Sequence, residues 1–135
     1  MFLQKLPAGF EYVSLQKDVR ASDLAASQGA SNVRHFGAQL LDFSDTAALC
    51  ELMDLVITVD TSVAHLSGAL GVPTWVLLPH LPDWRWLLNR RESPWYPSVR
   101  LYRQSKAQHW DDVFLAVAND LFAIGGADTQ HLAGL

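Results

Sequence analysis

Three small polar residues and a histidine follow an apolar segment in the middle of the sequence. Asp60, Thr61 and Ser62 come directly after LVITV (55–59), and His65 stands three residues later. Free backbone amides and hydroxyl groups at the N-terminus of a helix are a common binding site for phosphate, because the helix dipole is positive there. The spacing therefore predicts an anion site. The alternative is that Thr61 or Ser62 only caps the helix and that Asp60 closes the turn.

His65 also has two interpretations. In a helix that follows Ser62, the residues Val63, Leu66 and Leu70 form one apolar stripe, and His65 lies roughly opposite it. Its imidazole could reach a phosphate or a sugar, or it could bond a neighbouring carbonyl. No second histidine or carboxylate stands at helical spacing from it, so no metal site is expected.

The segment 79–97, PHLPDWRWLLNRRESPWYP, combines tryptophans with arginines. Aromatic rings and guanidinium groups on a loop suit recognition of a sugar or a base, through stacking and paired hydrogen bonds. The same residues could instead pack as a lid on the final helix. Six of the ten basic residues lie in or just after this segment, where they either meet an anionic ligand or form a solvated rim: Arg85, Arg90, Arg91, Arg100, Arg103 and Lys106.

Strand and helix patterns alternate along the chain. Five apolar or β-branched segments predict strands, at 10–16, 32–37, 55–59, 73–79 and 99–104. Asp42 and Asp45 predict an acidic capping box for a helix that ends near Met53. The last helix has an apolar face that begins at Trp110, and Gly125 is expected to lie beyond its end.

This alternation predicts an α/β domain, a three-layer sandwich around a mostly parallel sheet of about five strands. In such a sheet, ligands bind at the carboxyl ends of the strands. Three loops are expected at these ends, and they contain residues 16–18, 60–62 and 79–81.

Length and composition exclude several classes of protein. The chain has 135 residues and a net charge of -4, which fits one domain and argues against general binding to nucleic acids or membrane surfaces. A single cysteine, Cys50, excludes an internal disulfide. No apolar run approaches the roughly 20 residues of a membrane span, and no signal-peptide pattern opens the chain. A cytoplasmic protein is therefore expected.

Three segments together resemble a known family. DLVITVDTSVAHLSGALGVPTWVLLP (54–79), PDWRWLL (82–88) and SPWYPSVRLYRQ (93–104) are similar to the C-terminal domain of bacterial heptosyltransferase-like glycosyltransferases, of the kind often fused to tetratricopeptide repeats. The resemblance extends from about residue 10 to residue 123. It implies one Rossmann-like half of a GT-B fold, the half that holds the nucleotide-sugar donor.

The resemblance also implies roles for individual residues. The donor phosphates would contact Asp60, Thr61, Ser62 and His65. The nucleoside would contact Gln16, Lys17, Asp18 and Phe43. The sugar or the acceptor would lie near Trp84, Arg85 and Trp86. No catalytic residue is expected in this chain, because the acceptor-binding half typically supplies the base, and no metal or other cofactor is expected.

The expected domain covers residues 1–124, with a flexible tail at 125–135. The family's first strand and its basic loop are expected to be missing ahead of this domain, which would leave a sheet edge free. An unpaired strand edge readily joins another chain. The alternative function is therefore a non-catalytic module for homo-oligomerisation or protein interaction, formed by that edge and the tryptophan-rich segment.

Overall fold

The structure, a computed structural model, describes residues 6–19 and 33–132, with side chains described as far as residue 125. The chain forms two compact units. The first comprises Met1–Gln39 and Phe114–Leu135, and the second comprises Leu40–Val113.

Two short parallel strands lie in the first unit. Strand β1 (Tyr12–Ser14) pairs with β2 (Val33–His35), and a 3-10 helix, η2 (Gly37–Gln39), follows β2. Gly37 lies so close to the backbone carbonyls of Gln16 and Lys17 that a Cβ atom there would overlap them. This glycine therefore allows η2 to pack against the loop that follows β1.

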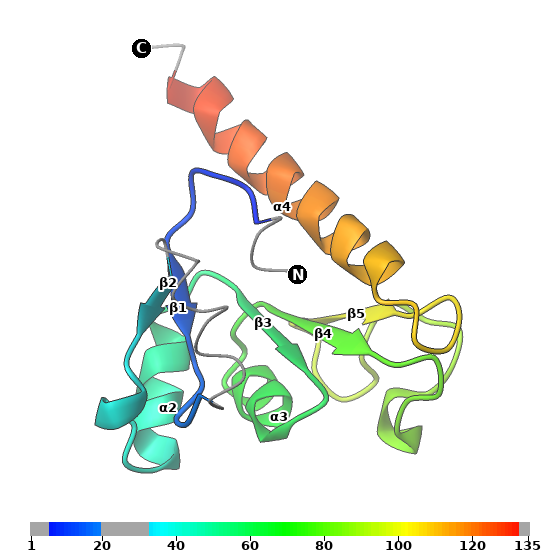
Figure 1. Ribbon diagram of the computed structural model, residues 1–135, viewed down its shortest axis with the longest axis horizontal. Helices are drawn as coiled ribbons and strands as arrows, with labels where there is room; N and C mark the ends of the chain where they lie inside the picture. Colours follow the sequence, from blue (N-terminus) through cyan, green and yellow to red (C-terminus); the bar gives the residue numbers. More distant parts are fainter. Residues whose placement is uncertain (1–5, 20–32, 133–135) are drawn as a thin grey trace. The chain divides into compact units, whose positions relative to one another are not determined.

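The second unit contains a three-stranded parallel sheet with the strands in chain order. Strands β3 (Val56–Val59), β4 (Thr74–Leu78) and β5 (Val99–Arg103) lie side by side, as Figure 1 shows. The central strand β4 is buried at every position. This explains its continuous apolar sequence, which is typical of a strand covered on both faces.

Helices cover one side of this unit and complete its core. Helix α3 (Ser62–Ala69) joins β3 to β4 and lies against both strands, and α2 (Phe43–Glu51) contacts α3. The buried core cluster draws on α3, β4, β5 and the segment between β4 and β5; it consists of Ala64, Val76, Leu78, Trp86, Val99 and Leu101. Burial of these apolar side chains is the main stabilising contribution to the unit.

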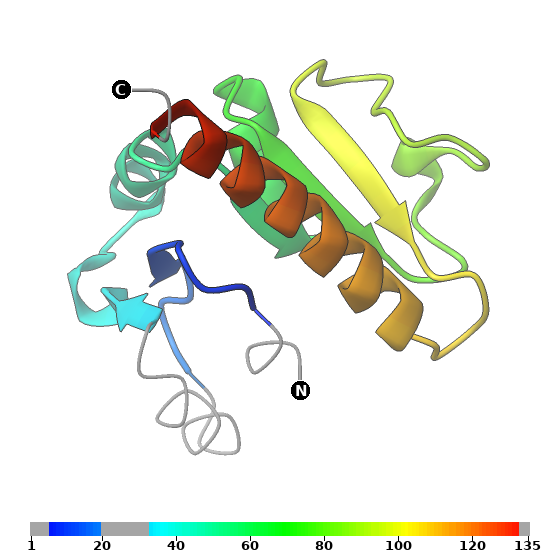
Figure 2. The same cartoon turned by 90° about the horizontal axis from the view of Figure 1, so that it is seen from above.

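The outer edge of β5 is partly covered by the segment that precedes it. The amide of Leu101 donates to the carbonyl of Arg91 at 2.6 Å, and Glu92 forms an antiparallel bridge with Arg100. Figure 2 shows this segment returning along the outer side of β5. Among the described strands, β3 pairs only with β4.

The capping box predicted for the first helix is confirmed. The carboxylate of Asp42 accepts hydrogen bonds from the amides of Ser44 (2.8 Å) and Asp45 (3.2 Å), and the carboxylate of Asp45 accepts one from the amide of Asp42 (3.3 Å). Helix α2 ends at Glu51, slightly earlier than the predicted end near Met53.

The α/β class is confirmed, and a strand occurs within each of the five predicted segments. Every described strand pair is parallel. The strands form one sheet of two and one of three, in separate compact units, so the single sheet of about five strands is not confirmed.

Helix α4 (Asp111–Leu132) is longer than predicted. Val113, Val117 and Leu121 are buried, as expected from the apolar face. Gly125 lies inside the helix, so the prediction that it lies beyond the helix end is wrong. Gly125 and Gly126 each cost a helix about 1 kcal/mol relative to alanine, and the helix continues through both. The Phe10 ring lies 3.0 Å from the position of a Cβ at residue 125. None of the helices in the described part of the chain has the length and apolar character required to cross a membrane.

The start of α4 provides a pH-dependent contribution to stability. Ser105 donates hydrogen bonds to the carboxylate of Asp112, including one from its amide at 3.1 Å, and these bonds lower the pKa of Asp112 below its usual value of 3.8. The lowered pKa stabilises the folded state above pH 3.8, and this contribution is lost as the pH falls through the folded-state pKa.

The free energy of unfolding should fall as the pH drops below about 4, and we expect this fall to be smaller in Asp112→Asn. The measurement is urea unfolding followed by circular dichroism over a pH series. Asp54→Asn, at an exposed carboxylate before β3, is the control. An equal fall in Asp112→Asn and in the unmodified chain would contradict the assignment.

Candidate anion-binding site at the start of helix α3

The N-terminus of α3 is not capped by a side chain. Thr61 occupies the N-cap position in an extended conformation (φ -139, ψ 174), but its hydroxyl makes no capping hydrogen bond. The Thr61 hydroxyl lies instead 3.2 Å from the hydroxyl of Thr58. Helix α2 differs, because the carboxylate of Asp42 satisfies two of its first amides. Thr61 is therefore the N-cap residue by position, but its side chain does not cap the helix.

This helix end lies at the carboxyl end of β3 and is accessible. Asp60, Thr61 and Ser62 are exposed, and the first backbone bond within the helix joins the amide of Ala64 to the carbonyl of Thr61 at 3.0 Å. The amides of Ser62 and Val63 precede that bond and have no capping side chain. Such amides, at the positive end of a helix, can donate to the oxygens of an anion.

His65 packs among aromatic rings in the structure. Its ring stacks on Trp86, with centroids 5.1 Å apart and planes 20° apart, and its Nδ1 lies 3.2 Å from the hydroxyl of Tyr96. The Tyr96 ring meets the imidazole edge to face at 5.9 Å. His65 is half-buried, and no described residue forms a hydrogen bond with its Nε2.

The buried face of α3 is not the predicted stripe. The buried residues are Ala64, Ser67 and Gly68, whereas Val63 and Leu66 are only half-buried and Leu70 is exposed. The reason is close packing: a Cβ at residue 68 would lie 2.7 Å from the Tyr96 ring and 3.0 Å from Val99. Small residues allow the helix to pack this closely. His65 therefore lies next to the buried face of α3, not on the opposite side of the helix.

The tryptophans after β4 have different environments. Trp84 and Trp86 belong to the 3-10 helix η3 (Trp84–Trp86), yet Trp84 is 70% exposed and Trp86 is fully buried. The Trp86 ring therefore supports His65 from within the core and presents no surface to a ligand in this structure. Trp84, in contrast, lies at the surface.

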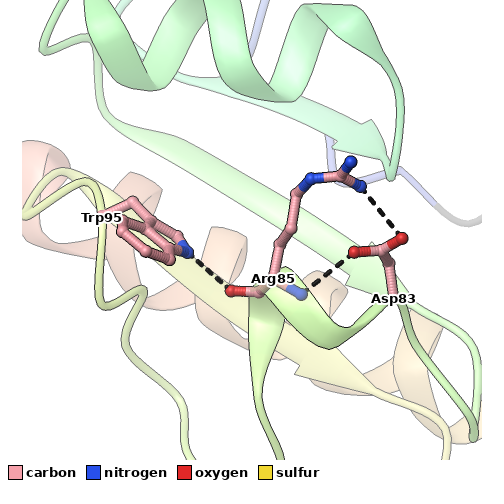
Figure 3. Close-up of polar contacts among 3 residues, drawn as sticks. All are labelled: Asp83, Arg85 and Trp95. Atoms are coloured by element: carbon pink, nitrogen blue, oxygen red, sulfur yellow. Dashed lines mark hydrogen bonds and ion pairs between the residues drawn. The ribbon is translucent and has the colours of Figure 1, made fainter.

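Arg85 is held by its own segment. Its guanidinium lies 2.9 Å from the carboxylate of Asp83, and its carbonyl accepts a hydrogen bond from Trp95 Nε1 at 2.7 Å. Figure 3 shows both contacts. Its guanidinium also lies over the Trp84 ring, 5.3 Å from the centroid. The charge of Arg85 is therefore already partnered, and these contacts order the loop.

Arg103, at the end of β5, fixes this loop to the sheet. Its guanidinium donates to the carbonyls of Trp86 (2.6 Å) and Arg90 (3.1 Å). Burial lowers the pKa of Arg103, and the nearby charge of Arg90 lowers it further. This member of the predicted basic cluster is thus a structural residue, and neither Arg103 nor Tyr96 was among the predicted site residues.

The remaining predicted residues are divided between the two units. Gln16, Lys17 and Asp18 are exposed after β1 in the first unit, whereas Phe43 is exposed at the start of α2 in the second. Within the second unit the structure brings His65 against Trp86, close to the start of α3. In the described part of the chain, no three histidine, cysteine or acidic side chains gather as a metal site would require.

Comparison with known proteins finds one partial similarity. The chain is 36% identical to Protein FlbA of Caulobacter vibrioides over 80 residues. The match covers 59% of this chain and 13% of FlbA, so the chain spans only a small part of that protein. No protein-family model and no solved structure matches the chain.

Proposed function

We propose that this chain is the donor-binding half of a bacterial, heptosyltransferase-like glycosyltransferase, and that the start of α3 binds the diphosphate of a nucleotide-sugar. The observation that carries the proposal is the uncapped N-terminus of α3 at the carboxyl end of a parallel strand. This is where open α/β sheets bind ligands, and it presents donors to an anion. We further propose that the domain is Rossmann-like, with a sheet of about five strands. We also propose that the protein is cytoplasmic.

The proposed chemistry is stabilisation of a leaving group. As an acceptor attacks the anomeric carbon, negative charge develops on the departing diphosphate. The amides of Ser62 and Val63, the hydroxyls of Thr61 and Ser62, and His65 Nε2 would donate to it. Donors that are already in place stabilise developing charge without reorganisation. The base that activates the acceptor is proposed to lie outside this chain, and no metal or other cofactor is required.

The other site assignments form part of the same proposal. Gln16, Lys17, Asp18 and Phe43 would contact the nucleoside. Trp84 and Arg85 would line the sugar or acceptor side, with Trp86 acting indirectly through His65. The buried position of Trp86 favours this indirect role.

Calorimetric titration with UDP, GDP and ADP tests this function. We expect weak binding of at least one of them and no turnover of a nucleotide-sugar by this chain alone. Uridine, guanosine and adenosine are the matched controls, because they lack the diphosphate that the helix end would hold. Failure of all three diphosphates to bind would overturn the proposal.

A second candidate function is an interaction module. Exposed large apolar side chains are frequent between β4 and β5, which favours contact with another chain; they include Leu81, Trp84, Leu88 and Trp95. Light scattering distinguishes the two functions. A dimer independent of concentration and unaffected by nucleotide would support the module, formed through the sheet edge expected from the sequence or through this segment.

A further inference from the structure

The His65 side chain is held in one orientation by aromatic neighbours. Trp86, which is fully buried, stacks on one face of the ring, and Tyr96 meets the ring at its edge. The Tyr96 hydroxyl lies 3.2 Å from Nδ1. One imidazole nitrogen is therefore occupied within the fold, and Nε2 is left without a partner among the described residues.

Tyr96 is itself fixed in place. Its amide donates to the hydroxyl of Ser93 at 3.2 Å, and its carbonyl accepts from the amide of Val99 at 3.0 Å. Its ring fills the space that the missing Cβ of Gly68 leaves open. The phenol hydroxyl consequently approaches Nδ1 from a defined position.

The tautomer of His65 sets the direction of this hydrogen bond, and the chemistry of the two groups favours one direction. A neutral imidazole has one nitrogen that donates and one that accepts, and a phenol O–H can donate to the accepting nitrogen. The phenol is much more acidic than the N–H of a neutral imidazole, so Tyr96 is the better donor. If Tyr96 donates to Nδ1, the imidazole proton must reside on Nε2.

We propose that Tyr96 is a positioning residue that holds His65 in the Nε2–H tautomer, so that Nε2 is a fixed hydrogen-bond donor to an anionic ligand. The hydroxyl contact and the packing of Tyr96 on Gly68 carry this inference. The identity of the ligand, a nucleoside diphosphate, rests on the proposed function; the tautomer does not. A neutral imidazole in this tautomer can donate its Nε2–H to a phosphate oxygen.

Nitrogen NMR of the ¹⁵N-labelled chain tests the tautomer directly, at about pH 8.5, where an ordinary histidine is neutral. Long-range correlations should show Nε2 of His65 protonated and Nδ1 unprotonated. Tyr96→Phe keeps the ring against Gly68 and removes only the hydroxyl, and it should give a mixture of both tautomers. A protonated Nδ1 in the unmodified chain, or an unchanged spectrum in Tyr96→Phe, would overturn the proposal.

Tyr12→Phe is the matched control. It also removes one tyrosine hydrogen bond, from the Tyr12 hydroxyl to the carbonyl of Pro7 at 2.7 Å, but in the other compact unit. The His65 nitrogen signals should be the same in this variant as in the unmodified chain. A change in both variants would indicate a general effect of losing a hydroxyl and would count against Tyr96 as the positioning residue.

Titration with UDP, GDP and ADP measures the consequence for binding. We expect Tyr96→Phe to weaken binding about three- to tenfold, the effect of one hydrogen bond to a ligand. Equal affinity in Tyr96→Phe and the unmodified chain would contradict the positioning role. If the unmodified chain shows the Nε2–H tautomer but binds no diphosphate, the proposed function fails while the tautomer assignment stands.

Discussion

Replacement of Trp86 by alanine is expected to lower the free energy of unfolding by about 3–5 kcal/mol. Trp86 has no exposed surface and packs in the core of the second unit, so its removal leaves a cavity that the neighbouring side chains cannot fill. Domains are typically stable by only about 5–15 kcal/mol, which makes this a large fraction of the total. Urea unfolding followed by circular dichroism at 222 nm measures the change.

Trp84→Ala is the matched control for this prediction. Trp84 lies two positions earlier in the same 3-10 helix but is 70% exposed, with the Arg85 guanidinium over its ring. We expect a loss of no more than about 1 kcal/mol. Similar losses in the two variants would show that Trp86 is not part of the core.

Gly68→Ala is expected to destabilise the chain by about 1–3 kcal/mol, although alanine is normally the better residue in a helix. A Cβ at this position would lie 2.7 Å and 2.9 Å from two atoms of the Tyr96 ring. The ring or the helix must move, and the contact with His65 is lost with it. Thermal and urea unfolding of the variant check the sign of the effect.

A double-mutant cycle with Tyr96→Ala isolates the cause. If the clash with the ring explains the loss, Gly68→Ala should be much less destabilising in the Tyr96→Ala background. If Gly68→Ala lowers the free energy of unfolding equally in both backgrounds, the clash is not with the Tyr96 ring. The effect would then come from Val99, whose methyl lies 3.0 Å from the position of the Cβ at residue 68.

The regular elements of this fold could largely be predicted from the sequence. Strand β4 has an unbroken apolar run, and Asp42 with Asp45 forms a capping box that depends only on local spacing. Both elements depend on residues that are close together in the sequence, so the sequence alone indicates them. The division of the strands between two sheets could not be predicted, because pairing depends on contacts between residues distant in the chain.

The packing of α3 was predicted incorrectly for a physical reason. Hydrophobic periodicity selects the largest apolar residues as the buried face, which favoured Val63, Leu66 and Leu70. In the structure the helix approaches the sheet through Ala64, Ser67 and Gly68, because small residues permit close contact. A glycine inside a helical pattern was the signal that could have revealed this.

The candidate site was predicted in part. The position of Asp60, Thr61 and Ser62 after a parallel strand followed from the sequence, and the absence of a capping bond at Thr61 required the structure. Trp86 and Tyr96 lie in an irregular segment without periodicity, so the sequence did not distinguish the buried Trp86 from the exposed Trp84. The contact of Tyr96 with His65 joins residues 31 positions apart and left no local signal.

Thr61→Asp is the sharpest test of diphosphate binding at the start of α3, because the substitution should raise the stability of the chain and weaken binding. An aspartate at the N-cap would satisfy the amides of α3, as Asp42 does in α2, and should stabilise the chain by about 0.5–1 kcal/mol. The same carboxylate would occupy the site and repel a diphosphate. Asp42→Asn, at a helix end that is already capped, is the control and should leave binding unchanged.

The measurement is calorimetric titration of Thr61→Asp with UDP, GDP and ADP, together with its unfolding curve. We expect a more stable variant that has lost the binding shown by the unmodified chain. Undiminished binding by a more stable Thr61→Asp variant would contradict the claim that the start of α3 holds the diphosphate.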